Sequence, residues 1–521
     1  MNEKLKYTFL LLAAGLFSVP AGAQMRTDTL TINSRARLHG EAVNAIGAFV
    51  YDDSPAAALY RYNSSLTEVG ARLDWRDEEQ ALLQAEGSGL LTGSFEVDSY
   101  LKLNANSAAF AGVEYTNGEK RNVLWNSTSD FMLLYPYIVA DSIGGDLRTE
   151  QYRFRGGYTR QDGRANYGLR ASYRALHEYR QADPRPRSRA TELTADLSAG
   201  YLFERYSLTG TFGLRVYKQD QDVDYYFEGG RNTIQFHLLG LGAYHGKFSS
   251  ASDNAMSTNY KGTAYSGAVV LAPRGGNGWF ASAKFDDFTV KQHIVAANDT
   301  PLTELNVQRL SGAVAYRNSS ARMNWGVEAA AEYELRQGTE MVLNNTAGYD
   351  NYILGEFTMY RNHISRGHVK GSVEWKREAL TWSLRPEVSY YRTSSEYLYP
   401  HRDMEFSHLT AGAEAGVVWL RDRWLLDAGV AAAYTPNLSS SLTLPESLNT
   451  DPNASMLTLA PEVTHVFSRL TTDYATAMLR LRGQYEINRT VALFAAVKWY
   501  THRFRGGLTD NILAVTLGVN F

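Results

Sequence analysis

Histidines are where acid–base or metal chemistry would begin, and in this chain they are scattered. A hydrolase needs a serine, a histidine and an acid, or two carboxylates, held close together. The sequence contains no G-x-S-x-G, H-E-x-x-H or P-loop pattern, and no cysteine for a thiolate nucleophile or metal ligand. We therefore predict no enzyme, cofactor or metal site from the histidines at His177, His237, His245, His293, His363, His368, His401 and His408.

Charged residues form a second group, because many of them alternate with apolar residues. Rings of charge on the inner wall of a channel bias which solutes pass. The same side chains can instead pair across neighbouring strands and only keep that wall satisfied. Both signs occur in similar number, so no ion preference follows and pairing is the favoured interpretation. The predicted lumen charges are Arg153, Arg155, Arg170, Arg174, Asp196, Glu328, Glu332, Arg385, Arg480 and Arg482.

The segment 122–146 is apolar and aromatic, although the pattern places it in a connection between strands. Such a connection either packs into the mouth of a barrel or meets a partner. We predict that 118–149 and 177–190 pack together as a cap that serves as a gate or a binding surface. Arginines would then pair with acids, because charges taken partly out of water need partners. The candidate ligand or gate residues are Trp125, Asp130, Tyr135, Tyr137, Asp141, Asp146, Arg180, Arg185 and Arg187, with Phe131 and Leu134 also turned inward.

Two alternatives concern the same cap. Asp141, Asp146 and the glycines between them could supply oxygen ligands to calcium, although their spacing matches no EF-hand loop. The cap could also be purely structural.

The elements that would hold these residues are membrane-spanning β-strands. Apolar and polar residues alternate over runs of about 10–14 residues, the length that a tilted membrane strand needs. Alternation predicts that Leu169, Leu197, Val327 and Leu517 face lipid, and that Arg170, Asp196, Glu328 and Thr516 face the lumen. We expect an all-β transmembrane antiparallel barrel of about 18 strands, with sixteen as the alternative. The predicted strands are 65–75, 92–104, 108–117, 150–160, 165–176, 191–202, 206–217, 260–272, 278–290, 303–317, 322–335, 366–376, 379–392, 406–420, 423–434, 470–485, 490–501 and 509–521.

The ends of the chain predict export to the cell outer membrane. Residues 1–23 read as a signal peptide, with a positive start, a short apolar run and the cleavage pattern Ala21-Gly22-Ala23. Short connections alternate with long ones, as periplasmic turns alternate with outer loops. The last strand ends on Phe521, an assembly signal of the kind that outer-membrane proteins present to the barrel-assembly machinery. Residues 24–64 precede the barrel of 65–521 as a periplasmic or lumen-plugging segment.

Composition narrows the partners. The net charge of -3 gives no basic excess, so we expect no nucleic-acid partner. The 34 tyrosines and 9 tryptophans suit the two interfaces of a membrane, and outer-membrane lipids are the expected surroundings. No run of about 18 uncharged apolar residues follows the leader, which argues against transmembrane helices.

Several short motifs resemble a family of unknown function among Bacteroidota outer-membrane β-barrels. The resemblance implies location and fold and leaves the substrate open. Residues 44–48 and 56–63 also resemble the N-terminal hatch of fatty-acid-transport-type barrels. The motifs shared with the first family are Ser99–Asn104, Trp125–Asp130, Leu134–Tyr137, Ala140–Asp146, Ser172–Leu176, His177–Arg180, Asp183–Arg187 and Met404–Phe406.

Two functions follow from these expectations. The first is passage or gating of a solute across the outer membrane, since 16–18 strands enclose an aqueous channel. The alternative is a non-conducting scaffold whose loops bind a surface lipoprotein or a TonB-dependent receptor. The two differ in whether 24–64 and 118–149 fill the lumen.

Overall fold

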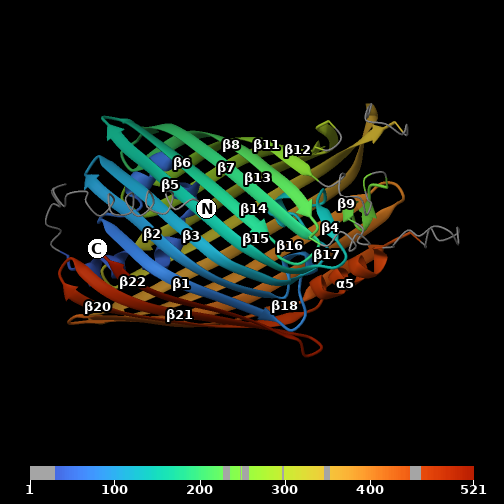
Figure 1. Ribbon diagram of the computed structural model, residues 1–521. Helices are drawn as coiled ribbons and strands as arrows, with labels where there is room; N and C mark the ends of the chain where they lie inside the picture. Colours follow the sequence, from blue (N-terminus) through green and yellow to red (C-terminus); the bar gives the residue numbers. More distant parts are fainter. Residues whose placement is uncertain are drawn as a thin grey trace.

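The computed structural model describes residues 30–226, 235–246, 248, 257–295, 298–344, 353–445 and 459–521. Its main element is a closed antiparallel barrel of eighteen strands, in which the last strand pairs with the first (Figure 1). The predicted number of strands is therefore confirmed, and the alternative of sixteen is wrong. The predicted signal peptide lies outside the described residues.

The barrel strands are strongly tilted, as Figure 1 shows. In chain order they are β1 (Leu66–Glu78), β2 (Gly89–Asn104), β3 (Ser107–Val123), β5 (Gly145–Asp162), β6 (Ala165–Tyr179), β7 (Arg185–Leu202), β8 (Tyr206–Asp224), β11 (Thr258–Pro273), β12 (Gly278–Ile294), β13 (Thr300–Ser319), β14 (Met323–Leu343), β15 (Ile353–Arg377), β16 (Leu380–Tyr397), β17 (Arg402–Arg421), β18 (Trp424–Thr435), β20 (Tyr474–Asn488), β21 (Val491–Phe504) and β22 (Thr509–Asn520). A short strand, β19 (Asn437–Thr443), follows β18 and pairs with β17.

The two ends of the barrel differ. At one end, called the turn end, the connections are short and the strand bounds agree with the prediction within a few residues. At the other, called the loop end, most strands run further than predicted, so parts of 118–149 and 177–190 are strand, whereas β20 begins at Tyr474 and not at the predicted 470. β15 begins at Ile353, where the alternation predicted a start at 366. In this extension both faces of the strand carry polar as well as apolar side chains, so the alternation of apolar and polar residues is lost. Backbone pairing nevertheless continues, as between Thr339 of β14 and Thr358 of β15.

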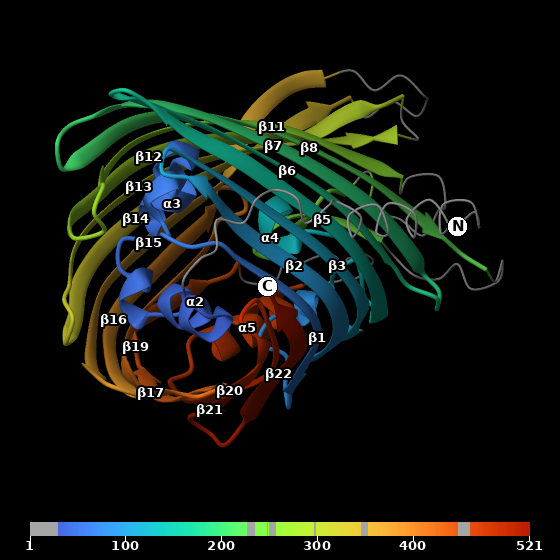
Figure 2. The ribbon, with the colours of Figure 1, turned by 90° about the vertical axis from the view of Figure 1, so that its left-hand side faces the viewer.

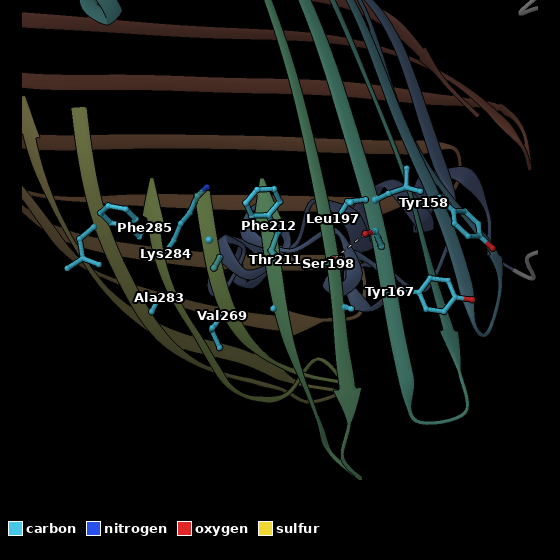
Figure 3. A pocket seen from close by; sticks show the side chains of 17 residues that line it. Tyr158, Tyr167, Leu197, Ser198, Thr211, Phe212, Val269, Ala283, Lys284 and Phe285 are labelled. Atoms are coloured by element: carbon cyan, nitrogen blue, oxygen red, sulfur yellow. Dashed lines mark hydrogen bonds between the residues drawn. The ribbon is translucent and has the colours of Figure 1, made fainter. Parts of the chain in front are cut away.

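Side-chain facing follows the predicted alternation. Leu197 and Leu517 lie on the outer surface with 63% and 61% of their area exposed. Arg170 points inward, where its guanidinium donates to Asp196 and to the backbone oxygen of Asp52. On the outer surface of β5–β13, small residues such as Gly210 and Gly267 leave a shallow apolar groove bordered by larger side chains (Figure 3). This groove lies outside the lumen.

An N-terminal plug, defined as residues 32–61, lies inside the barrel at the turn end. It consists of α2 (Ile32–His39), η1 (Ala42–Ala45), α3 (Phe49–Asp53) and η2 (Pro55–Tyr60). Figure 2 looks along the barrel and shows α2 and α3 within the ring of strands. The plug contacts strands around the lumen, from β1 and β3 to β20 and β21.

The loop end is filled by a second piece of chain, here called the loop-end insertion and defined as residues 124–144. It contains α4 (Phe131–Leu134) and β4 (Val139–Asp141). β4 pairs with β9 (Gln235–Gly240), which in turn pairs with β10 (Ala243–Tyr244). A helix between β19 and β20, α5 (Ala460–Leu470), and a turn, η3 (Gln84–Glu86), complete this end. None of the helices in the described ranges has the length and apolar character needed to cross a membrane.

Candidate functional site

Carboxylates of the barrel wall hold the N-terminal plug by its backbone. Glu374 accepts hydrogen bonds from the N–H groups of Ala42 at 2.7 Å and Val43 at 3.3 Å. Glu328 accepts from the N–H of Gly47 at 2.8 Å. Both carboxylates are 3% exposed. The first N–H groups of a helical turn have no partners within the turn, so a buried carboxylate is a favourable acceptor for them.

The middle of the plug approaches the wall at backbone distance. The N–H of Ala56 donates to the hydroxyl of Ser198 at 2.7 Å, and Thr159 donates to the carbonyl of Ala56. Gly168 makes this approach possible, because a Cβ there would lie 2.5 Å from the nitrogen of Ala56. Tyr100 donates to the carbonyl of Ala58. The plug is thus held by polar contacts along its whole length.

His39 is the titratable group at the end of α2. Its ring stacks on Tyr62 at 3.9 Å between centroids, and its Nε2 lies 3.0 Å from the carbonyl oxygen of Ser64. Burial, helped by the charges of Arg35 and Arg61 and opposed by the contact with the Ser64 carbonyl, lowers the pKa of His39 from 6.5 to about 4. The imidazole is therefore neutral in the seated plug at neutral pH.

The loop-end insertion is held by a hydrophobic core. Leu134, Tyr137 and Ile138 are buried with Tyr217 and Tyr360 of the wall. This agrees with the expectation that Leu134 and Tyr137 turn inward. Gly338 on β14 leaves room for Tyr137, because a Cβ there would lie 2.2 Å from its hydroxyl oxygen. Apolar burial on this scale fixes the insertion against one side of the lumen.

One of the predicted ion pairs lies at the base of the insertion. Arg180 Nη1 lies 2.9 Å from Asp141 Oδ2, and both side chains are almost completely buried. Asp141 also accepts from the hydroxyl of Ser127 and the N–H groups of Ile143 and Gly144. Its oxygens are thus occupied by donors. The described part of the chain contains no group of His, Asp and Glu arranged for a metal ion.

The other predicted pairings of the cap are wrong. Arg185 pairs with Asp183 at 2.7 Å, and Arg187 lies 3.9 Å from Asp222. Asp146 accepts from the backbone N–H of Asn122 instead of an arginine. β7 continues to the loop end, so its register places Arg187 opposite Asp222 of β8, while Arg185 pairs with Asp183 just before its own strand.

Two arginines hold α4 at its ends. Arg174 donates to both oxygens of Asp130, the residue before α4, at 2.8 and 2.7 Å. Arg336 donates to the carbonyls of Met132, Leu133 and Tyr135 at 3.1, 2.8 and 2.8 Å. The last carbonyls of a helix lack partners within it, so a buried guanidinium is well matched to them. Together these contacts fix α4 across the lumen.

An apolar chamber of about 680 Å³ lies between the insertion and α5. Val463, Val466 and Leu470 of α5 contribute one side of its lining. Trp125, Phe131 and Tyr135 of the insertion, all partly buried, line the chamber as well. Further lining side chains come from the wall and from the turn near η3, among them Leu82, Leu83, Tyr391, Phe406 and Phe504.

A polar chamber of about 750 Å³ adjoins the apolar chamber. Its lining is rich in charged groups from β1, β2, β3 and β6, including Arg72, Glu96 and Lys120. Phe131 and Met132 line both chambers. α4 therefore stands between an apolar and a polar compartment of the same lumen.

The predicted lumen charges are paired, mostly across strands. Glu328, beside its bond to the plug, contacts His368 at 3.1 Å and Lys370 at 2.8 Å. A wall of alternating charges with paired neighbours has no dominant sign, which agrees with the pairing interpretation. The other pairs are Arg153–Glu114, Arg155–Asp98, Arg170–Asp196, Arg174–Asp130, Arg366–Glu332, Arg385–Glu414, Arg480–Asp427 and Arg482–Glu68.

Sequence reasoning missed α5 and Arg336. The stretch 435–469 read as a long connection, yet Val463, Val466, Phe467 and Leu470 follow the spacing of an apolar helix face. That signal could have predicted α5. Arg336 gave no signal, because its partners are backbone carbonyls more than 200 positions away.

The model of a family described as "Family of unknown function (DUF6850)" matches residues 55–521. No curated protein matches the chain. Among similar solved structures, the siderophore receptor PiuA from Acinetobacter baumannii has 9% sequence identity and a TM-score of 0.37, and the match covers 88% of this chain and 82% of that one. The ferric-catecholate import receptor Fiu from E. coli K12 has 9% identity and a TM-score of 0.38, with 87% of this chain and 81% of that one covered. A mutant of the ferric enterobactin receptor PfeA from Pseudomonas aeruginosa has 8% identity and a TM-score of 0.38, with 88% of this chain and 80% of that one covered. At these identities the likeness concerns the barrel fold alone.

Proposed function

Because the chain belongs to this family of unknown function, its activity has to be inferred from its own lumen, and we propose that it is an outer-membrane transport barrel for a small apolar or amphipathic solute. The apolar chamber is the observation that carries this proposal. A lumen filled with water would favour polar lining, whereas here an amphipathic helix presents Val463, Val466 and Leu470 to the cavity. Covering such a surface stabilises a complex by roughly 25 cal/mol per Å² of apolar area.

In this proposal the loop end faces outward and the turn end faces the periplasm. The exposed apolar outer surface supports contact with lipid. The solute would enter the apolar chamber from the loop end, pass α4 into the polar chamber and leave after the plug moves. The plug inside the turn end supports a barrel that is closed at rest.

The binding step is tested with the protein in lipid nanodiscs. Bromododecane should quench the fluorescence of Trp125, whose contribution is the difference between the wild type and Trp125→Phe. Val463→Asp should raise the bromododecane concentration needed for half-maximal quenching at least about tenfold, because a carboxylate is costly beside an apolar ligand. Thr464→Asp is the matched control, since Thr464 is on the exposed side of the same helix. Equal quenching in both variants would contradict the assignment of the chamber.

The transport step needs a second measurement. Cells that carry the barrel in their outer membrane should take up the dye N-phenyl-naphthylamine faster than cells with the Val463→Asp variant at equal protein level. Uptake that is the same with the wild type, the variant and no barrel would overturn the transport role and leave the chamber as a binding site only.

A further inference from the structure

Besides its charged groups, the described lining of the apolar chamber contains two polar side chains with a buried atom that lacks a hydrogen-bond partner, Gln84 at its Oε1 and His408 at its Nδ1. His408 on β17 is 9% exposed and belongs to the lining. Its Nε2 lies 2.8 Å from the carbonyl oxygen of Leu470, at the end of α5. A carbonyl oxygen only accepts, so Nε2 carries the hydrogen of the neutral ring and Nδ1 is left as an acceptor. Among the described residues Nδ1 has no hydrogen-bond partner.

The arginines of the same lining already have carboxylates or backbone oxygens beside them. Arg469 donates to the carbonyl of Gln80 and lies 3.6 Å from Asp510. Arg336 is engaged by three carbonyls and by Glu334 at 3.3 Å. An anionic head group would therefore have to displace an existing partner of an arginine, whereas a neutral donor can bond to His408 Nδ1 without displacing one.

The surroundings of His408 are aromatic and aliphatic. Its ring packs against Phe406 at 5.4 Å between centroids, and Phe406 in turn packs against Tyr391 at 5.9 Å. Leu470 and Val466 of α5 belong to the same lining. A buried acceptor in such surroundings costs free energy as long as it is unpaired, and a ligand that supplies a hydrogen regains it.

We propose that the apolar chamber selects an aliphatic molecule that carries a hydroxyl group, and that His408 Nδ1 accepts the hydroxyl hydrogen. This inference rests on the proposed function, because it names the class of solute for the same chamber. His408 is thereby a specificity-determining residue: the apolar lining binds the body of the ligand, and the imidazole distinguishes an alcohol from an ether or an alkane.

The test compares two probes that differ in whether their oxygen carries a hydrogen or a methyl group. Bromoundecanol, with bromine at the far end of its chain, and its methyl ether are titrated against the nanodisc-embedded protein, again read as quenching of Trp125. The wild type should bind the alcohol about tenfold more tightly than the ether. His408→Phe should bind the two equally. His408→Gln should restore the preference, because its amide can donate to Leu470 and accept from the ligand.

The outcomes separate the two proposals. Equal binding of alcohol and ether by the wild type overturns the role of His408 and leaves the chamber assignment standing. Failure of both probes to quench Trp125 overturns the chamber as the solute site. A preference that persists in His408→Phe also overturns the inference, because another group must then read the hydroxyl.

Discussion

The N-terminal plug and the loop-end insertion both fill the lumen, but polar and apolar contacts contribute to them in different proportions. The plug is attached by backbone hydrogen bonds to wall side chains such as Glu328 and Glu374, and by a small apolar cluster in which Ile46 and Val50 pack with Phe280 of the wall. The insertion is attached by an apolar core around Tyr137 and by the buried pair of Arg180 and Asp141. The insertion has the larger apolar core and an almost completely buried ion pair, and both are costly to expose, whereas hydrogen bonds can be exchanged for bonds to water at small net cost. We therefore expect the plug to move more easily than the insertion.

The largest effect should come from the buried ion pair of the insertion. Arg180→Ala leaves Asp141 charged and buried without its cation, which costs roughly 3–5 kcal/mol in free energy of unfolding. Limited proteolysis should then cut within 124–144, a segment that its burial should protect in the wild type. Arg187→Ala is the control, because its side chain is half exposed and should change stability by roughly 0–1 kcal/mol. If 124–144 resisted proteolysis in Arg180→Ala, the insertion would not depend on its buried ion pair, and the contrast with the plug would fail.

A moderate effect is expected at the plug. In the double variant Glu328→Gln and Glu374→Gln, each amide can place an N–H against the N–H groups of Gly47, Ala42 and Val43, so the plug should loosen. Single-channel conductance in planar bilayers should rise several-fold while the barrel stays folded.

Glu332→Gln is the matched control for the plug variant. Glu332 is also a wall carboxylate, but its partners are Arg309 and Arg366 of the wall. If the double variant folds normally and conducts like the wild type and this control, the carboxylates do not hold the plug and the comparison fails.

The smallest effect should be a pH dependence confined to α2. Because burial lowers the pKa of His39 to about 4, the seated imidazole stays neutral while a released one protonates near its ordinary pKa of 6.5. Protons therefore favour release, and attachment that is complete above pH 6.5 weakens as the pH falls toward 4. Channel openings should become more frequent between pH 7 and pH 5.

His39→Gln should flatten this profile, because glutamine keeps a donor toward Ser64 and does not titrate. Arg35 and Arg61 stay charged over the whole range, so they add no pH dependence of their own. An unchanged profile in His39→Gln would assign the effect to other groups of the lumen.

Much of the barrel could be predicted from the sequence, because alternation is a local property. The alternation of Leu197 with Asp196 predicts which face of the strand meets lipid, and the short connections predict where the strand ends at the turn end. The loop-end strand limits were not predictable in this way, because β14 and β15 continue by backbone pairing where the apolar alternation has ended.

In the predicted cap of 118–149 and 177–190, too, some features follow from the sequence and others only from the tertiary structure. The sequence by itself determined that Arg180 would need an acid and that the aromatic segment 122–146 would turn inward, since burial of apolar groups and pairing of charges apply wherever those residues lie. Only the tertiary structure decided that Asp141, rather than Asp130 or Asp146, is the partner. It alone placed α5, Arg336 and His408 around one chamber, because strands far apart in the chain meet there and no local pattern records which of them become neighbours.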